Sequence, residues 1–224
     1  MSRFLFPRWS NALLPVIVVV GGILPIYVLY FVAYGFSPKT LDVGYQPTQP
    51  VPFSHELHAG QLGMDCRYCH NTVERASHAA VPPTQTCMNC HTQIMPESPK
   101  LAPIHASYET GLPMEWIRVH RVPDYAYFSH SAHVNRGVGC VSCHGRIDQM
   151  PVVYQSKPLS MGFCLDCHRD PEPNLRPVSE MTNMGWGRGP DLTAEDHAEI
   201  AKARSQVLDL YHISPSENCS TCHR

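Results

Sequence analysis

The cysteines of this chain occur in one repeated pattern, in which two cysteines enclose two other residues and a histidine follows at once. The pattern occurs five times, as "CRYCH", "CMNCH", "CVSCH", "CLDCH" and "CSTCH", and uses all ten cysteines. Cysteines at this spacing reach the two vinyl groups on one edge of a haem, and the adjacent histidine then lies under the iron as an axial ligand. A disulfide framework needs no such histidine, and zinc needs two converging ligand pairs. The pattern therefore predicts five covalently attached haem c groups.

The five motifs are numbered in chain order, and each residue has an expected role. The attaching cysteines are Cys66, Cys69, Cys87, Cys90, Cys140, Cys143, Cys164, Cys167, Cys219 and Cys222. The proximal iron ligands are expected to be His70, His91, His144, His168 and His223. The first cysteines of successive motifs lie 21, 53, 24 and 55 residues apart, which indicates two haem pairs and a fifth haem at the carboxyl end.

A haem bound in this way has a second axial position, and its occupant separates an electron carrier from a catalyst. Fourteen histidines less the five proximal ones leave nine. Two similar strings, "FSHELH" at 53–58 and "FSHSAH" at 128–133, each place two histidines three residues apart, on one face of a helical turn. Each turn can thus serve two neighbouring irons, with Phe53 and Phe128 against the macrocycles. The distal ligands predicted from these strings are His55, His58, His130 and His133.

The fifth distal ligand is less constrained by the sequence. His120 is the first choice because aromatic residues surround it in "WIRVHRVPDYAYFSH", with Trp116 one turn earlier. Met150 and Met161 are the alternatives, since a thioether is a known sixth ligand. The remaining histidines are not expected to be ligands: His78, His105, His197 and His212.

The amino-terminal residues indicate how this domain is held at a membrane. Asn11–Phe36 contains 26 residues without a charge, more than the roughly 20 needed to cross a bilayer. Arg3 and Arg8 precede the run, so the positive-inside rule places the amino terminus in the cytoplasm and the haem domain outside. A cleaved signal peptide is the alternative, but the run is too long and lacks a small-residue cleavage site. A kink or a neighbouring helix is suggested by Pro15, Gly21, Gly22 and Pro25.

The chain divides into five expected segments. Residues 1–36 form the cytoplasmic tip and the transmembrane helix, and residues 37–52 form a proline-rich tether. Residues 53–100 are the first dihaem module, and residues 101–170 are the second with its preceding linker. Residues 171–224 hold an irregular arm, a helix and the fifth haem. With 21 prolines and 14 glycines, the expected fold consists of short α-helices and irregular loops packed around five haems.

Two features precede the fifth motif. Residues 170–191 are expected to form a long irregular arm that either packs on the surface or wraps a partner. A helix is expected to begin at Thr193, where Asp196 completes a capping box. Its apolar face, which we expect to cover a haem, consists of Ile200, Ala203, Val207 and Tyr211.

The expected holoprotein is acidic. The chain carries a formal charge of −2. Ten haem propionates bring this to about −12, and five ferric haems return about +5. Nucleic acid is therefore not an expected partner. Three arginines near haem motifs either pair with propionates or remain solvated: Arg67, Arg136 and Arg169.

Several longer strings point to a known family. They are "FPRWSN", "GYQPTQPVPFSHELHAGQLGMDCRYCH", "PPTQTCMNCH", "VHRVPDYAYFSHSAHVNRGVGCVSCHG" and "LSMGFCLDCHR", and they cover most of the chain. Together they resemble the pentahaem membrane-anchored cytochrome c subunit of bacterial alternative complex III, a quinol-oxidising complex. The resemblance implies closely stacked haems in a fold similar to the multihaem class III cytochromes. By position, it implies five distal ligands: His55, His58, His120, His130 and His133.

The resemblance further implies an electron-transfer subunit of a respiratory or photosynthetic complex, rather than an enzyme by itself. Electrons would arrive from an iron–sulfur subunit, beside membrane subunits that bind quinol, and leave to another cytochrome or a soluble acceptor. Two alternatives stay open. One is a self-sufficient multihaem quinol dehydrogenase of the small tetrahaem anchor type, and the other is a catalytic multihaem reductase with an open iron.

Overall fold

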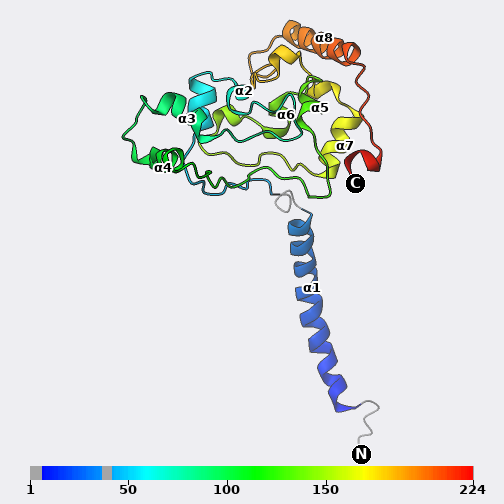
Figure 1. Ribbon diagram of the computed structural model, residues 1–224. Coiled ribbons are helices and arrows are strands. Elements are labelled where there is room, and N and C mark those ends of the chain that lie inside the picture. The colour runs from blue at the N-terminus through cyan, green and yellow to red at the C-terminus, as the bar shows by residue number, and fades with distance from the viewer. Residues whose placement is uncertain (1–6, 37–41, 224) are drawn as a thin grey trace, which may run out of the picture. The chain divides into compact units, whose positions relative to one another are not determined.

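Residues 7–36 and 42–223 are described by a computed structural model of the chain, shown in Figure 1. The chain divides into two compact units, Met1–Asp42 and Val43–Arg224. Arg3 and residues 37–41 of the expected tether lie outside the described residues, as does the side chain of Arg8. The two units are therefore considered separately.

The described part of the first unit is one apolar helix. A short 3-10 turn, η1 (Arg8–Ala12), leads into α1 (Leu13–Gly35). No α1 residue is buried, and the helix is long and apolar enough to cross a membrane. Pro15 lies in the first turn, where no helical hydrogen bond is lost, whereas Pro25 lies inside the helix. The predicted apolar helix is confirmed. An amino-terminal helix of this kind is an anchor or a signal sequence.

The second unit consists of short helices joined by loops. Its α-helices are α2 (Cys66–Cys69), α3 (Thr84–His91), α4 (Ala102–Thr110), α5 (His130–Val134), α6 (Cys140–His144), α7 (Met161–Arg169), α8 (Ala194–Leu210) and α9 (Cys219–Cys222). The tighter or wider turns are η3 (Glu56–Gln61), η4 (Pro99–Leu101), η5 (Ile147–Gln149), η6 (Glu172–Asn174) and η7 (Val178–Glu180). Within the described ranges no strand forms, and extended pairing is limited to two isolated bridges. The expected architecture of short helices and irregular loops is confirmed.

Side chains fill only part of the interior of this unit. One apolar cluster joins α3 to α4, which run side by side in Figure 1, and consists of Val51, Met88 and Ile104. Elsewhere the most deeply buried apolar side chains are those of Leu175 and Met181, each 1% exposed. Apolar burial on this scale is small for a unit of this length, so another group is needed to complete the interior.

The arm at residues 170–191 packs into this unit. Leu175 pairs with Val138 in an isolated antiparallel bridge, and the Arg176 amide donates to the Gly137 carbonyl at 2.9 Å. The Cys140 amide donates to the Met181 carbonyl at 3.2 Å. Of the two expectations for the arm, packing is therefore the one observed, and the packing is internal rather than superficial.

The helix α8 begins as the sequence predicts. The Thr193 amide donates to the Asp196 carboxylate at 2.7 Å, and the Asp196 amide donates to the Thr193 hydroxyl at 3.2 Å. This reciprocal capping box satisfies amides that the first helical turn leaves without partners. Val207 is buried on the inner face of the helix, next to Gly137. The predicted apolar face is confirmed at this residue.

The described part of the tether is hydrogen bonded along the second unit. The Gly44 amide donates to the Gln155 carbonyl at 2.8 Å, and the Gln155 amide donates to the Tyr45 carbonyl at 3.0 Å. Gln49 and Ile117 exchange two further hydrogen bonds, of 2.8 and 2.9 Å. These contacts explain why the compact unit already begins at Val43.

The packing of the arm predicts a specific cost at Gly137, which has φ +81°. A Cβ at this residue would meet the Arg176 carbonyl, whereas a Cβ at Gly111, with φ +72°, would meet nothing within 4 Å. Both Gly→Ala substitutions carry the left-handed backbone cost of about 1–2 kcal/mol. Gly137→Ala should add about 1–3 kcal/mol for the steric overlap. Thermal unfolding of the detergent-solubilised holoprotein measures the difference, and equal losses would contradict the packing.

Candidate multihaem site

Each of the five motifs lies on or at the end of a short helix. The cysteine pairs begin and end α2 and α9, open α6, and lie within α3 and α7. Residues three apart on a helix share one face, so both thiols of each motif point to the same side of the helix. None of the ten thiols forms a disulfide. Among the described residues no cluster of histidine, cysteine and carboxylate side chains could hold a metal ion directly.

A large cavity connects the motifs. Its volume is about 1970 Å³, whereas pockets for ordinary small ligands have roughly 300–1,000 Å³. The cysteines and histidines of the first three motifs line it, and Cys164 and Thr221 of the last two motifs reach it. All five predicted distal histidines also line this cavity. A space of this size beside free thiols fits several macrocycles.

Four pairs of histidine rings face each other, three of them across this cavity. Metal–imidazole bonds are about 2 Å long, so an iron between two ring nitrogens separates the ring centroids by roughly 6 Å. The observed centroid separations are 6.5, 6.3, 6.3 and 6.2 Å. They belong to the pairs His55–His70, His58–His91, His130–His144 and His133–His168. Each pair combines one histidine of a motif with one histidine of an "FSHxxH" string, so the geometry fits two axial ligands per iron.

Each string supplies histidine rings that face two successive motifs. The first string faces the first and second motifs, and the second string faces the third and fourth. The two strings repeat the same ring geometry, because Phe53 stacks on His58 at 4.4 Å and Phe128 stacks on His133 at 4.5 Å. The phenylalanine rings thus support the distal histidines, in addition to any contact with the macrocycles.

Backbone carbonyls fix the tautomer of most of these histidines. A carbonyl only accepts, so a ring Nδ1 at hydrogen-bond distance carries the proton and leaves Nε2 free to bind a metal. The distal rings bonded in this way are His58 to Ser54, His130 to Ser77 and His133 to Ser129, at 2.7–2.8 Å. The proximal ones are His70 to Ala80, His91 to Ile94, His168 to Ser216 and His223 to Tyr125, at 2.8–3.1 Å. Because the acceptors are backbone carbonyls, which every residue type carries, the residue types in the sequence give no signal for these contacts.

Three further predicted ligands have a buried ring nitrogen without a hydrogen-bond partner among the described residues: Nδ1 of His55, Nδ1 of His144 and Nε2 of His120. Burial lowers the pKa of His55 and His120 to about 4 and that of His144 to about 3. These rings are therefore neutral near pH 7 and keep a lone pair. An unpartnered buried nitrogen is costly unless another group satisfies it.

The fifth motif differs from the other four. The Tyr125 ring lies 5.8 Å from that of His223, and the Tyr125 carbonyl accepts the hydrogen bond from His223 Nδ1. His120 instead contacts the His144 ring edge-on at 4.4 Å, too close for an iron between the two rings. Among the alternatives, Met150 is 3% exposed and lies next to Gly145, whereas Met161 is 63% exposed at the start of α7.

The histidines that were not expected to be ligands lie outside these facing pairs. Nδ1 of His78 forms a hydrogen bond of 2.8 Å with the Ser77 hydroxyl, in which either group can be the donor. His197 is exposed in the first turn of α8. His212 is exposed, with φ 47°. His105, in α4, has a buried Nε2 without a partner.

Neighbouring thiols reveal the spatial order of the motifs. A hydrogen bond donated by the Cys66 thiol to Cys140 raises the pKa of Cys66, which places the first and third motifs next to each other. Burial and then the Cys87 thiol raise the pKa of Cys69, so the second motif adjoins the first. In the same way, burial and then nearby thiols of the fourth motif raise the pKa of Cys143 to about 11. Burial and Cys222 raise that of Cys164. The order in space is second, first, third, fourth, fifth.

Two of the arginines near haem motifs have protein carboxylates as partners. Arg67 pairs with Asp65 at 2.9 Å and with Glu74 at 3.1 Å, and Arg169 pairs with Glu217 at 3.0 Å. These ion pairs add to the expected solvation, since the Arg67 and Arg169 side chains are 43% and 58% exposed. Arg136 is exposed and forms no ion pair with a described residue.

Comparison with known proteins agrees with this geometry. The family described as cytochrome c7 and related cytochrome c matches residues 51–103 and 126–224, which include all five motifs. A curated relative, the multihaem cytochrome c subunit of menaquinone reductase from Nitratidesulfovibrio vulgaris (strain Hildenborough), is 31% identical over 209 residues. The matched region covers 91% of each chain. The chain therefore belongs to the multihaem c-type cytochromes of the cytochrome c7 family.

Proposed function

We propose that this chain is a membrane-anchored electron carrier with five covalently attached haem c groups, working in a quinone-linked membrane complex. The observation that carries the proposal is the set of four histidine pairs whose ring centroids lie 6.2–6.5 Å apart. An iron with two protein ligands has no free position for a substrate, so such a site favours electron transfer over bond chemistry.

The proposed ligand pairs follow the facing rings. His70 and His55 hold the first iron, and the remaining assignments, from second to fourth, are His91 with His58, His144 with His130, and His168 with His133. For the fifth iron, held by His223, His120 stays the proposed ligand by position in the family. Its place beside His144 requires that it move, and Met150 and Met161 remain the alternatives.

The chain itself supplies position and environment. Haem iron supplies a reversible one-electron Fe(III)/Fe(II) couple. The cysteine pairs anchor the groups, the carbonyl-bound Nδ1 atoms aim Nε2 into the cavity, and Phe53 and Phe128 stabilise the distal rings. In the spatial order of the motifs, each motif adjoins the next, so the haems would form a continuous path from the second motif to the fifth.

The quinone link comes from the relative, whose name is menaquinone reductase. Within such complexes we propose the role of the cytochrome subunit of alternative complex III, because the longer strings of the sequence resemble that family. The partners would then be an iron–sulfur subunit, membrane subunits that bind quinol, and a downstream cytochrome or soluble acceptor. The apolar helix α1 would anchor the chain with its amino terminus in the cytoplasm and the haem domain on the other side.

The number of attached haems is the first quantity to test. Pyridine haemochrome analysis of the purified full-length chain should return five haems per polypeptide, one for each motif. The double substitution Cys219→Ser with Cys222→Ser should return four, because both thioether positions of the fifth haem are lost. Ser220→Ala, between the same cysteines, should retain five. Fewer than five in the unaltered chain would contradict the proposal.

Carbon monoxide binding tests the ligand pairs. The reduced chain should bind little carbon monoxide, because both axial positions of each iron are filled. His58→Ala should open the second iron and bind about one equivalent more. His78→Ala, which removes a histidine outside the ring pairs, should behave like the unaltered chain. No extra binding by His58→Ala would refute the pairing, and stoichiometric binding by the unaltered chain would favour the reductase with an open iron.

Quinol oxidation distinguishes the carrier from a self-sufficient dehydrogenase. The isolated chain should not turn over a soluble menaquinol analogue with an artificial acceptor, whereas the intact membrane complex should. Haem content and low-spin spectra of the same isolated sample provide the control for an intact protein. Sustained turnover by the isolated chain would replace the proposal with the quinol dehydrogenase alternative.

A further inference from the structure

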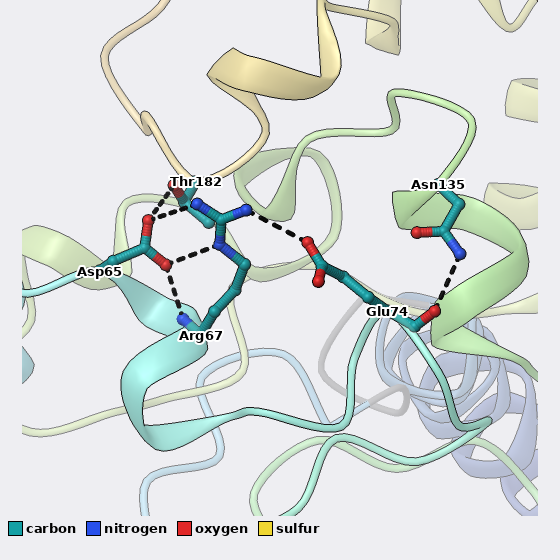
Figure 2. Close-up of polar contacts among 5 residues, drawn as sticks. All are labelled: Asp65, Arg67, Glu74, Asn135 and Thr182. Carbon is teal, nitrogen blue, oxygen red and sulfur yellow. Dashed lines mark hydrogen bonds and ion pairs between the residues drawn. The ribbon is translucent and has the colours of Figure 1, made fainter.

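We propose that a hydrogen-bond network joining Asp65, Arg67, Glu74, Asn135 and Thr182 positions the first haem motif against the third, and thereby sets the rate of electron transfer between the two dihaem modules. We call these five residues the inter-module clamp (Figure 2). The inference rests on the proposed function, since it concerns one step of the path from the second motif to the fifth.

No single histidine string spans the step between the modules. Within each module, one string holds the distal rings of both motifs, so the two motifs share a rigid turn. The first and third motifs belong to different strings and meet at Cys66 and Cys140. Other contacts must therefore fix their separation.

Two consecutive residues of the arm provide one such contact. The Met181 carbonyl accepts from the Cys140 amide at 3.2 Å, at the first residue of the third motif. The Thr182 hydroxyl donates to the Asp65 carboxylate at 3.0 Å, one residue before the first motif. Two adjacent residues, the buried Met181 and the partly exposed Thr182, thus hold both motifs, and Figure 2 shows Thr182 reaching Asp65 from the arm.

Asp65 is itself fixed to the first motif. It is the N-cap of α2, and its carboxylate accepts from the Arg67 amide at 2.8 Å and from the Arg67 Nε and Nη2 atoms at 2.9 Å. These hydrogen bonds lower the pKa of Asp65 to about 2, so the acceptor is ionised near neutral pH. Two parallel hydrogen bonds from a guanidinium to a carboxylate define the orientation of the carboxylate as well as its distance.

Arg67 extends the clamp to the second module. Its Nη1 atom donates to the Glu74 carboxylate at 3.1 Å, and the Asn135 side chain donates to the Glu74 carbonyl at 2.9 Å. Figure 2 shows this line of contacts from α2 to the residue after α5. The start of α5 is held nearby, because the His130 amide donates to the Ser77 carbonyl at 3.0 Å.

The clamp is suited to positioning rather than to overall stability. The Arg67, Asp65 and Glu74 side chains are each about two-fifths exposed, and exposed ion pairs contribute at most about 1 kcal/mol. A small displacement of reacting groups nevertheless changes a rate steeply. In the step concerned, one electron leaves one iron, which is oxidised from Fe(II) to Fe(III), and the same electron reduces the other iron from Fe(III) to Fe(II).

The test measures this step in the full-length holoprotein. A ruthenium photosensitiser on Lys100, in η4 after the second motif, injects one electron into the first module on a laser flash. A sacrificial amine re-reduces the oxidised ruthenium. Arginine replaces the other three lysines to make the label unique: Lys39, Lys157 and Lys202. The subsequent shift of the reduced α-band reports transfer into the second module.

Thr182→Val should slow this transfer by about tenfold, because it removes the hydroxyl donor but keeps the side-chain shape. Thr182→Ser, which retains the hydroxyl, should restore the original rate. Thr110→Val is the matched control, since its hydroxyl bonds only within and just after α4, and should leave the rate unchanged. Asp65→Asn, which weakens the same contact from the other side, should slow the transfer as well.

Haem content and spin state of each sample separate the possible failures. An unaltered chain without five low-spin haems would overturn the proposed function. An unaltered chain with them, combined with wild-type rates in both Thr182→Val and Asp65→Asn, would overturn only the clamp. Hydrogen exchange gives an independent readout, because Thr182→Val should expose the Cys140 amide while the α3 amides stay protected. Unchanged protection of Cys140 would count against the clamp.

Discussion

Two imidazole rings must face each other at the distance that one iron requires, and this constraint explains the rest of the fold. A centroid separation of 6.2–6.5 Å is met four times, and each time it joins a histidine fixed by a cysteine pair to one from a distant string. Helices of four to nine residues are sufficient to carry these rings, and longer ones would separate them. The sparse apolar core and the cavity of about 1970 Å³ have the same origin, because macrocycles take the place of side chains.

The two dihaem modules use the same local structure. A string of six residues supplies two distal rings and a phenylalanine that stacks on the second of them, and it occurs once in each module. The fifth motif lacks such a string, and its histidine is held instead by a carbonyl of the linker at Tyr125. It is joined to the fourth motif through the Ser216 carbonyl, which accepts from His168. The proposed path would therefore have a regular part of two modules and a separate final member.

Features encoded within a few residues were predictable from the sequence, and features set by distant contacts were not. The motifs, the histidine turns, the apolar helix and the Thr193 capping box each depend on neighbours in the chain. The role of the arm depends on Met181 and Thr182 meeting residues of both modules, for which no local pattern exists. The place of His120 beside His144 and the pairing of Arg169 with Glu217 likewise follow from tertiary packing rather than from spacing.

The central claim is that at least four irons of this cytochrome have two histidine ligands each. Near-infrared magnetic circular dichroism of the fully oxidised holoprotein tests it most directly, because the charge-transfer band of low-spin ferric haem depends on the pair of axial ligands. The account predicts that bis-histidine iron dominates the spectrum, with one haem free to differ, as the geometry around His223 allows. Histidine–methionine bands from two or more irons per chain, or high-spin bands from any iron, would contradict it.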